Sequence, residues 1–367
     1  MPLSQQKYKI ISVVGARPQF IKLAGLQKTI GKEKRIEHII VHSGQHYDHA
    51  LSGQFFKEFD IPVPEYNIGI GSGNHNNQMA NCILGMDEIL QKENPSMVIV
   101  YGDTNTTSAA AIATAKRNIP LSHIEAGLRE FDKSIPEEVN KLITDALTDL
   151  YFVPTKTGIK NLKNQGIVKN VFLTGDITLD LLYHVDRKVY SEELLKKAKL
   201  NKGAYIFATC HRAANTDNKN HLSEILNALA RVTYPVILSL HPRTKKAIKS
   251  HRLEKLLDTS NIVCIEPPGF WDTQSWIKNA VFVITDSGGI IKETYFYKVP
   301  GIIIDKQTEW IETVDEGWNI ITGPNTDKIL EAINIFKIPT RHSNCIGNGS
   351  AGPMIVHEIL KYLDARK

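Results

Sequence analysis

Short runs rich in β-branched residues alternate along the chain with longer stretches that carry helical spacing. This is the βαβ pattern of parallel sheets covered by helices on both faces. The first half predicts strands at 9–14, 37–42, 97–101, 121–125, 150–153 and 171–174, and helices at 19–30, 77–91, 106–117, 137–147 and 157–164. After about residue 176 a second series predicts strands at 205–209, 235–240, 262–265, 281–285 and 301–304, with helices that include 221–231 and 326–336. We therefore predict an α/β protein with two Rossmann-like, doubly wound domains.

The length of 367 residues fits two such domains, since a single core stops growing beyond about 250–300 residues. We place the N-terminal domain at 1–175 and the C-terminal domain at 176–352, and we expect a cleft between them. The stretch 175–203 is itself predicted to be mostly helical, so it marks no sharp hinge. Residues 353–367 carry apolar positions at helical spacing and predict a last helix that packs back on one domain or bridges both.

The charge balance excludes one class of partner. The chain carries 44 basic and 39 acidic residues, a formal net charge of +5, which is too mild an excess for a nucleic-acid binder. Its four cysteines are widely spaced and predict reduced, buried thiols. We find no signal segment and no run long enough to cross a bilayer. We expect a cytoplasmic protein that binds a phosphorylated small molecule, with neither nucleic acid nor membrane as a partner.

The octet 286–293 is the most informative motif for binding. A buried strand that ends in Ser287, Gly288 and Gly289 and opens into a helix presents backbone N–H groups and a positive dipole end, which suits a diphosphate. Glu293, one helical turn later, could then bind a ribose diol. Alternatively, the two glycines simply allow a tight turn between strand and helix.

Three acids follow predicted strands or begin a helix in the first half: Asp103, Glu125 and Glu137. Carboxylates that converge in a dry site perturb each other's pKa and suit general acid and base catalysis. Structural roles are also open for two of them, because Asp103 could cap the following helix and Glu137 could complement a helix dipole. Glu125, at the end of an apolar strand, is the hardest to explain structurally.

Cations also gather at predicted strand ends, where open α/β sheets bind their ligands. They are Arg17 and Lys22 in the first half and His211, Arg212, His241 and Arg243 in the second. We interpret them as groups that face an anion, with His211 also a possible acid or base. His42, His46 and His49 are close in sequence, but no helix sets their spacing, so we predict no metal site.

Eight motifs in order make the chain similar to a known family. They are GARPQFIK (15–22), SGQHYD (43–48), GDTNTT (102–107), HIEAGLRE (123–130), PEEVNK (136–141), CHRAAN (210–215), HPRT (241–244) and DSGGIIKE (286–293). Over nearly its whole length the chain resembles the non-hydrolysing UDP-N-acetylglucosamine 2-epimerases. The resemblance implies the glycosyltransferase B architecture, with UDP held mainly by the second domain. It also implies elimination of UDP to a 2-acetamidoglucal and its re-addition, with the proton at carbon 2 returned to the other face.

The resemblance also assigns roles to residues. The implied catalytic residues are Asp103, Glu125, Glu137 and His211. The implied substrate-binding residues are Arg17, Lys22, Arg129, Arg212, His241, Arg243, Ser287, Gly288, Gly289 and Glu293. A regulatory site would involve Gln45, His46 and Gln78. The partner is then a UDP-sugar, no cofactor is expected, and a homodimer is plausible for the family.

The chain departs from the family pattern at three positions. Lys141 replaces a frequent Arg, Ala214 replaces a common Glu, and Asp48 stands where allosterically activated members tend to carry an amide. Residues 308–313 resemble a subgroup that includes epimerases for UDP-diacetamido-uronates, so the sugar substituents stay open. A glycosyltransferase of the same fold, a hydrolysing epimerase and an inactive nucleotide-sugar sensor also stay open, because fold does not fix function.

Overall fold

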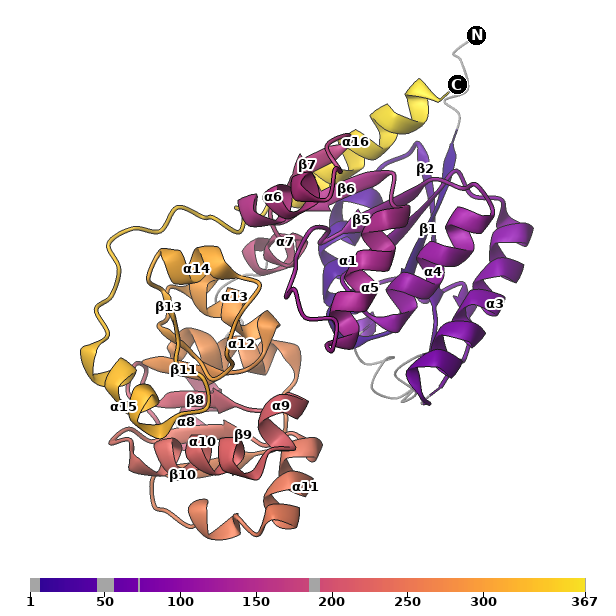
Figure 1. The fold of residues 1–367 in the computed structure, drawn as a ribbon. Helices are drawn as coiled ribbons and strands as arrows, with labels where there is room; N and C mark the ends of the chain where they lie inside the picture. The colour runs from indigo at the N-terminus through magenta and orange to yellow at the C-terminus, as the bar shows by residue number, and fades with distance from the viewer. Residues whose placement is uncertain (1–6, 45–55, 72, 185–191, 367) are drawn as a thin grey trace. The chain divides into compact units, whose positions relative to one another are not determined.

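The computed structural model describes residues 7–44, 56–71, 73–184 and 192–366. The chain divides into two compact units (Figure 1). One comprises Met1–Val185 and Ile346–Lys367, and the other Asp186–Cys345. Within the described residues, no helix is long and apolar enough to cross a membrane.

The first unit contains a seven-stranded parallel sheet in the order β3-β2-β1-β4-β5-β6-β7. Its strands are β1 (Tyr8–Val14), β2 (Ile36–His42), β3 (Tyr66–Asn67), β4 (Met97–Tyr101), β5 (Leu121–Ile124), β6 (Leu150–Val153) and β7 (Val171–Leu173). The central strands are almost wholly buried, as their continuous apolar runs predict. The order is that of a Rossmann sheet extended by β7. All six predicted strands form; β3 was missed because two residues carry no periodicity.

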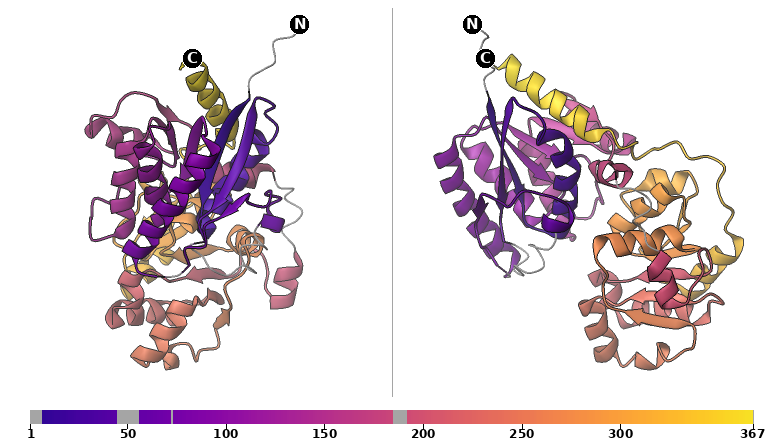
Figure 2. Two further views of the ribbon diagram at one scale, coloured as in Figure 1. Left: turned by 90° about the vertical axis from the view of Figure 1, so that its right-hand side faces the viewer. Right: turned by 180° about the vertical axis from the view of Figure 1, so that it is seen from behind.

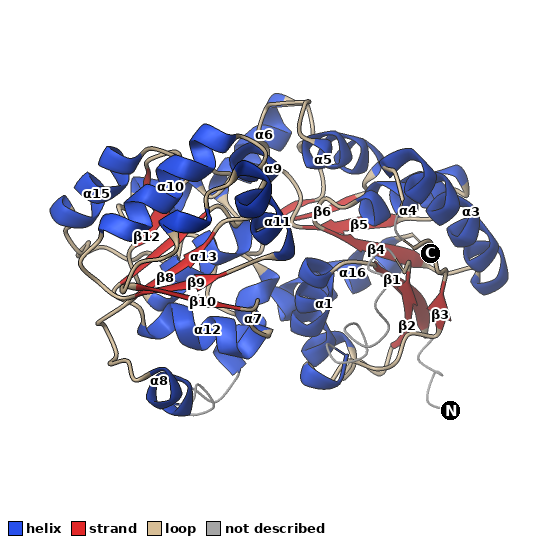
Figure 3. Ribbon diagram, turned by 90° about the horizontal axis from the view of Figure 1, so that it is seen from below, coloured by secondary structure: helices blue, strands red, loops and turns tan. Residues whose placement is uncertain are grey.

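Helices cover both faces of this sheet (Figure 3). They are α1 (Arg17–Ile30), α3 (His75–Glu93), α4 (Asn105–Lys116), α5 (Pro136–Leu147), α6 (Lys156–Asn164), α7 (Ile177–His184) and α16 (Ala351–Ala365). Helices α3 and α4 pack with β1 and β4 in one apolar core, while α1, α7 and α16 contact one another on the opposite face. Both layers leave the carboxyl edge of the sheet for loops.

The first unit ends later than the predicted boundary at residue 175 and includes the last helix (Figure 2). Helix α7 belongs to it because α7 packs closely on α1. A Cβ at Gly25 of α1 would lie 2.3 Å from the carbonyl oxygen of Ile177, so this approach requires glycine. Asp180 of α7 then accepts hydrogen bonds from the first backbone N–H groups of α16, those of Ala351 (3.1 Å) and Gly352 (2.7 Å).

The second unit repeats the plan with six parallel strands in the order β10-β9-β8-β11-β12-β13. The strands are β8 (Ile206–Thr209), β9 (Val236–Ser239), β10 (Ile262–Ile265), β11 (Phe282–Thr285), β12 (Gly301–Ile303) and β13 (Asn319–Ile321). The helices are α8 (Glu192–Ala198), α9 (Ala213–Thr216), α10 (Lys219–Arg231), α11 (Pro242–His251), α12 (Phe270–Asn279), α13 (Gly288–Tyr297), α14 (Ile311–Asp315) and α15 (Thr326–Ile335). Helices α10, α11 and α15 share one core with the sheet, and α8 and α12 share another. The predicted class of two Rossmann-like parallel sheets is confirmed.

Candidate functional site

In each sheet the strand order reverses between two neighbouring strands, β1 and β4 in the first unit and β8 and β11 in the second. In doubly wound sheets, ligands bind outside the carboxyl ends of the strands at this point. The predicted site residues follow those ends. Arg17, Asp103 and Glu125 come after β1, β4 and β5, while His211, His241 and Ser287 come after β8, β9 and β11.

The turn after β1 is fixed by Gln19, which sequence reasoning did not single out. Its buried Oε1 accepts hydrogen bonds from the backbone N–H groups of Gly15 (2.8 Å) and Ala16 (3.0 Å). Gly15 leaves no room for a side chain, since a Cβ would lie 2.0 Å from Ser43 Oγ. The turn therefore places Arg17 at the first position of α1 and Lys22 a little more than one helical turn later.

Glu125 forms an ion pair with Lys22 at this edge of the first unit. Its Oε1 lies 2.8 Å from Lys22 Nζ, and both side chains are about nine-tenths buried (7% and 11% exposed). We predicted Glu125 as the last residue of a strand, but β5 ends at Ile124 and Glu125 takes a φ of 75°. Such left-handed conformations in a residue other than glycine are costly and cluster at functional sites. The backbone thus turns this carboxylate toward Lys22.

Asp103 has a different cation beside it, Lys141 of α5. Lys141 Nζ lies 3.4 Å from Asp103 Oδ2 and 3.4 Å from Glu130 Oε2, and the lysine is buried. The backbone of Asp103 is also held, because Asn140 Nδ2 donates to its carbonyl oxygen (2.9 Å). Sequence reasoning noted Lys141 only as a departure from arginine and missed Glu130 and Asn140. Glu130 lies in the motif HIEAGLRE and Asn140 in PEEVNK, and these positions in the family motifs could have indicated them.

Glu137 is the second residue of α5 and is exposed. Its neighbour Glu138 is instead buried and accepts a hydrogen bond from the backbone N–H of Glu130 (2.8 Å). The structure therefore pairs Glu125 with Lys22 and Asp103 with Lys141, and shows Glu137 in the first turn of α5. A catalytic role for Glu137 stays a prediction.

Arg129, predicted to bind substrate, lies inside the first unit. Its Nη2 is 2.6 Å from Asp145 Oδ2 and 2.8 Å from Gln165 Oε1, and none of its side chain is exposed. The other oxygen of Asp145 faces His123 Nδ1 at 2.7 Å. Burial raises the pKa of Asp145, but His123 and Arg129 outweigh it, so the pKa is lowered overall. A substrate contact by Arg129 would require this ion pair to open.

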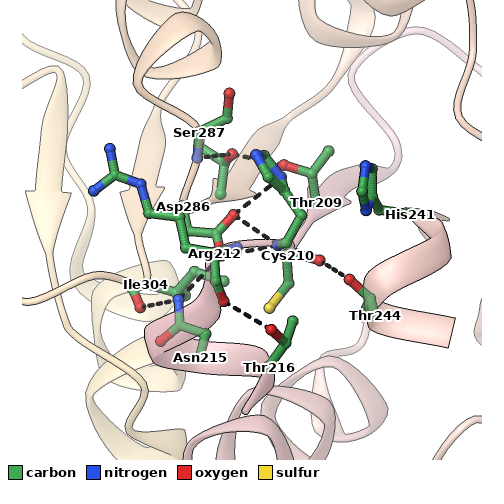
Figure 4. A network of polar contacts seen from close by, with 12 residues as sticks. Thr209, Cys210, Arg212, Asn215, Thr216, His241, Thr244, Asp286, Ser287 and Ile304 are labelled. Atoms are coloured by element: carbon green, nitrogen blue, oxygen red, sulfur yellow. Dashed lines mark hydrogen bonds and ion pairs between the residues drawn. The ribbon is translucent and has the colours of Figure 1, made fainter. Parts of the chain in front are cut away.

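In the second unit, Asp286 organises the loop after β8 (Figure 4). Its buried carboxylate accepts hydrogen bonds from the backbone N–H groups of His211 (2.9 and 3.0 Å) and Arg212 (2.9 Å), and from Asn215 Nδ2 (3.1 Å). The imidazole Nδ1 of His211 lies 3.4 Å from the same group. The sequence indicates Asp286 only as the start of the phosphate loop. Instead, it fixes the backbone that carries both predicted binding cations.

The other predicted site cations of this unit, Arg212, His241 and Arg243, also follow the carboxyl ends of its strands. Arg212 Nη1 is 3.0 Å from Asp305 Oδ2, and the rings of His211 and His241 lie 5.5 Å apart. Burial lowers the pKa of His241, as do the nearby charges of His211 and Arg243. His241 Nδ1 also accepts a hydrogen bond from the backbone N–H of Arg243 (3.2 Å), so that nitrogen is unprotonated.

Arg243 itself contacts Asp217 (2.6 Å) and Thr216 Oγ1 (2.9 Å). These contacts leave its guanidinium part-exposed.

The predicted phosphate loop opens a ten-residue helix, α13, with Ser287 at the N-cap. The side chain of Ser287 makes no capping hydrogen bond. A Cβ at Gly289 would lie 3.9 Å from its nearest described neighbour, Ser287 Oγ, whereas a Cβ at Gly288 would lie 3.5 Å from Glu309 Oε1. Backbone N–H groups at a helix start can bind an anion. Glu293 lies buried one turn further along the helix. The binding role of the octet stays a prediction.

The predicted regulatory residues, and the three histidines considered for a metal site, are described in part. Gln45, His46 and His49 lie outside the described residues. Gln78 of α3 donates to the carbonyl oxygen of Gly71 (3.2 Å) and accepts from Asn105 Nδ2 (2.9 Å). Among the residues whose placement is described, no group of three or more His, Cys, Asp or Glu side chains could hold a metal ion.

The family model for UDP-N-acetylglucosamine 2-epimerase matches residues 28–360 of this chain. The chain belongs to the UDP-N-acetylglucosamine 2-epimerase family. A UDP-N-acetylglucosamine 2-epimerase homolog of Methanococcus maripaludis is 44% identical over 359 residues, which cover 97% of this chain and 100% of the relative. The UDP-2,3-diacetamido-2,3-dideoxy-D-glucuronate 2-epimerase of Pseudomonas aeruginosa is 36% identical, with 96% of this chain and 99% of that protein covered.

A solved structure of the same family is also similar over most of this member's length. The Methanocaldococcus jannaschii UDP-GlcNAc 2-epimerase, in complex with UDP-GlcNAc and UDP, is 36% identical with a TM-score of 0.89. The match covers 96% of this chain and 99% of that one. The family resemblance and the fold class predicted from the motifs are therefore confirmed.

Proposed function

We propose that this family member inverts carbon 2 of a UDP-N-acetylhexosamine and interconverts UDP-N-acetylglucosamine and UDP-N-acetylmannosamine. A base takes the proton from carbon 2, and the bond between carbon 1 and the UDP oxygen breaks, with its electron pair leaving on UDP. UDP then adds back to carbon 1 of the glycal, and carbon 2 is reprotonated on the other face. The observation that carries this proposal is that Glu125 and Asp103 each pair with a buried lysine at the carboxyl edge of the first sheet, in a chain of this family.

In the proposed reaction the second unit holds the nucleotide. The start of α13 at Ser287, Gly288 and Gly289 suits the diphosphate, and Glu293 suits the ribose. Asp286 fixes the backbone of His211 and Arg212, two of the cations proposed to face the anionic substrate. His241 and Arg243 complete the proposed binding group. These contacts would bind UDP before elimination and retain it afterwards.

The acids of the first unit handle the proton. Glu125 and Asp103 each lie beside a buried lysine, which favours the ionised carboxylate that a general base requires. Glu137 is the third proposed acid, and Arg17 and Lys22 are proposed to contact the substrate. His211 is the proposed acid or base on the nucleotide side.

A modified sugar is the second candidate substrate, because the similar Pseudomonas aeruginosa enzyme bears the name of a UDP-diacetamido-glucuronate 2-epimerase. We further propose a cytoplasmic homodimer that feeds a surface polysaccharide pathway. Membership of the family supports this setting, and light scattering on the purified protein tests the dimer.

Proton exchange tests the reaction directly. The protein is incubated with UDP-N-acetylglucosamine in deuterated water, and in a second sample with the diacetamido-uronate, and each sugar is followed by NMR. A UDP-linked manno product with deuterium at carbon 2 supports the main proposal. Free sugar indicates hydrolysis, and exchange on the uronate alone moves the assignment to that substrate. No exchange on either sugar rejects the epimerase proposal.

A further inference from the structure

The motif that contains Glu125 begins with His123, a histidine to which the proposed reaction gives no part. His123 is the third residue of β5 and is fully buried. Its Nδ1 lies 2.7 Å from Asp145 Oδ1, and its Nε2 lies 2.8 Å from the carbonyl oxygen of Gly102. Both ring nitrogens are therefore within hydrogen-bond distance of an oxygen.

Neither oxygen can donate. A carbonyl oxygen is always an acceptor. Asp145 is an ionised carboxylate, because it also faces the guanidinium of Arg129 at 2.6 Å and accepts from the backbone N–H of Gly127 at 3.1 Å. A neutral imidazole has a single N–H and would leave one of its nitrogens pointing its lone pair at an acceptor. The contacts require a proton on both nitrogens.

We propose that His123 is a buried imidazolium that acts as a positioning residue for the proposed epimerase reaction. It holds the turn that carries Asp103 and places a positive charge behind the catalytic acids. His123, Arg129 and Asp145 together carry one net positive charge, with every charged group of the set buried. The charge of His123 stands independently of the proposed function, and its catalytic effect rests on that function.

Gly102 connects this charge to the acids. The carbonyl oxygen that His123 holds belongs to the peptide bond between Gly102 and Asp103, so the bond orients the peptide that leads into Asp103. Asn140 holds the next carbonyl, that of Asp103 itself. Gly102 has a φ of 59°, and a Cβ there would lie 3.1 Å from Lys22 Nζ and 3.5 Å from Glu125 Oε1. One short turn therefore lies between the imidazolium and the Lys22–Glu125 pair.

Imidazole nitrogen shifts test the charge in the full-length protein. The chain has 13 histidines, which can be labelled selectively with ¹⁵N, and His123→Gln assigns the signal of interest. At the pH of the activity assay, both ring nitrogens of His123 should show a bonded proton. His38 is a matched internal control, since its nitrogens face Gln27 Oε1 and Ser12 Oγ, a pair that suits a neutral ring. A His123 ring with one protonated nitrogen would overturn the proposal.

Kinetics test the positioning role. In His123→Gln, kcat should fall by about 100-fold, as for a displaced catalytic group, while KM changes little and UDP binds as in the wild type. His38→Gln should keep the wild-type kcat. A folded His123→Gln variant with wild-type kcat would refute the role. If the wild type turns over neither sugar, the proposed function fails, while the nitrogen shifts still decide the charge of His123.

Discussion

The two units share a strand order but treat their carboxylates in opposite ways. In the first unit, Glu125 and Asp103 at the carboxyl edge each contact a lysine side chain. In the second unit, the corresponding acid, Asp286, turns inward and accepts hydrogen bonds from backbone N–H groups and an amide. The acids of the first unit keep cationic partners, whereas the acid of the second fixes a loop that presents cations.

This difference separates two tasks on one fold. A carboxylate beside a lysine is kept ionised, which a general base requires, although the same lysine also lowers its basicity. A carboxylate already saturated by backbone donors cannot easily accept a proton, but it stiffens the loop that must bind an anion. If the comparison is correct, changes in the first unit should reduce turnover, and changes around Asp286 should reduce UDP affinity.

The largest expected effect is on turnover. Glu125→Gln removes the proposed base and should lower kcat by about 10²–10⁴-fold, the usual contribution of a general acid or base. UDP affinity, measured by titration calorimetry, should stay at the wild-type value because the residues proposed to hold the nucleotide belong to the second unit. Glu88→Gln, an exposed change on α3, is the control and should be silent. Near-normal turnover in Glu125→Gln would remove Glu125 from the mechanism.

The opposite outcome is expected for Asp286→Asn. In this variant the side-chain amide would turn its own N–H toward the backbone N–H donors, or rotate away and leave those donors without an acceptor. An unsatisfied buried donor costs about 1–3 kcal/mol. UDP affinity should fall by about 10- to 100-fold. Asp327→Asn is the matched control, because its ion pair with Arg231 is exposed and should contribute little. Equal affinities in the two variants would contradict the role of Asp286.

Lys141 sharpens the comparison within the first unit. Lys141→Met leaves Asp103 and Glu130 without their shared cation, so we expect kcat to fall by about tenfold or more through misplacement of Asp103. Lys141→Arg keeps the charge and should recover much of the activity. The kcat values of both variants, measured with the same deuterium assay, check this. If methionine were tolerated as well as arginine, the charge at this position would not matter.

The sequence predicted the two sheets well, because buried strands with continuous apolar runs are local signals. The very short β3 and β13 were missed because two or three residues carry no readable period. The role of Asp286 was missed because it depends on contacts between distant segments. Its position after β11 was clear, but the direction of its side chain depends on backbone N–H groups from a loop far away in sequence. The lysine partners of the acids likewise come from distant helices.

The smallest effect is expected for Asp180, an aspartate of the first unit that, like Asp286, accepts hydrogen bonds from backbone N–H groups. Burial raises its pKa to about 6, against the hydrogen bonds from Gly352 and Ala351, and the charge of Asp176 adds to the rise. From the ordinary pKa near 3.8 up to about 6 the folded protein binds more protons than the unfolded chain, so stability falls as the pH rises through this window and then levels off. The change attributable to Asp180 is about 3 kcal/mol at most. Hydrogen exchange of the α16 amides should show this pH-dependent loss of stability in the wild type, and Asp180→Asn should abolish the pH dependence. An unchanged pH dependence in Asp180→Asn would mean that this carboxylate, unlike Asp286, does little to hold its partner segment.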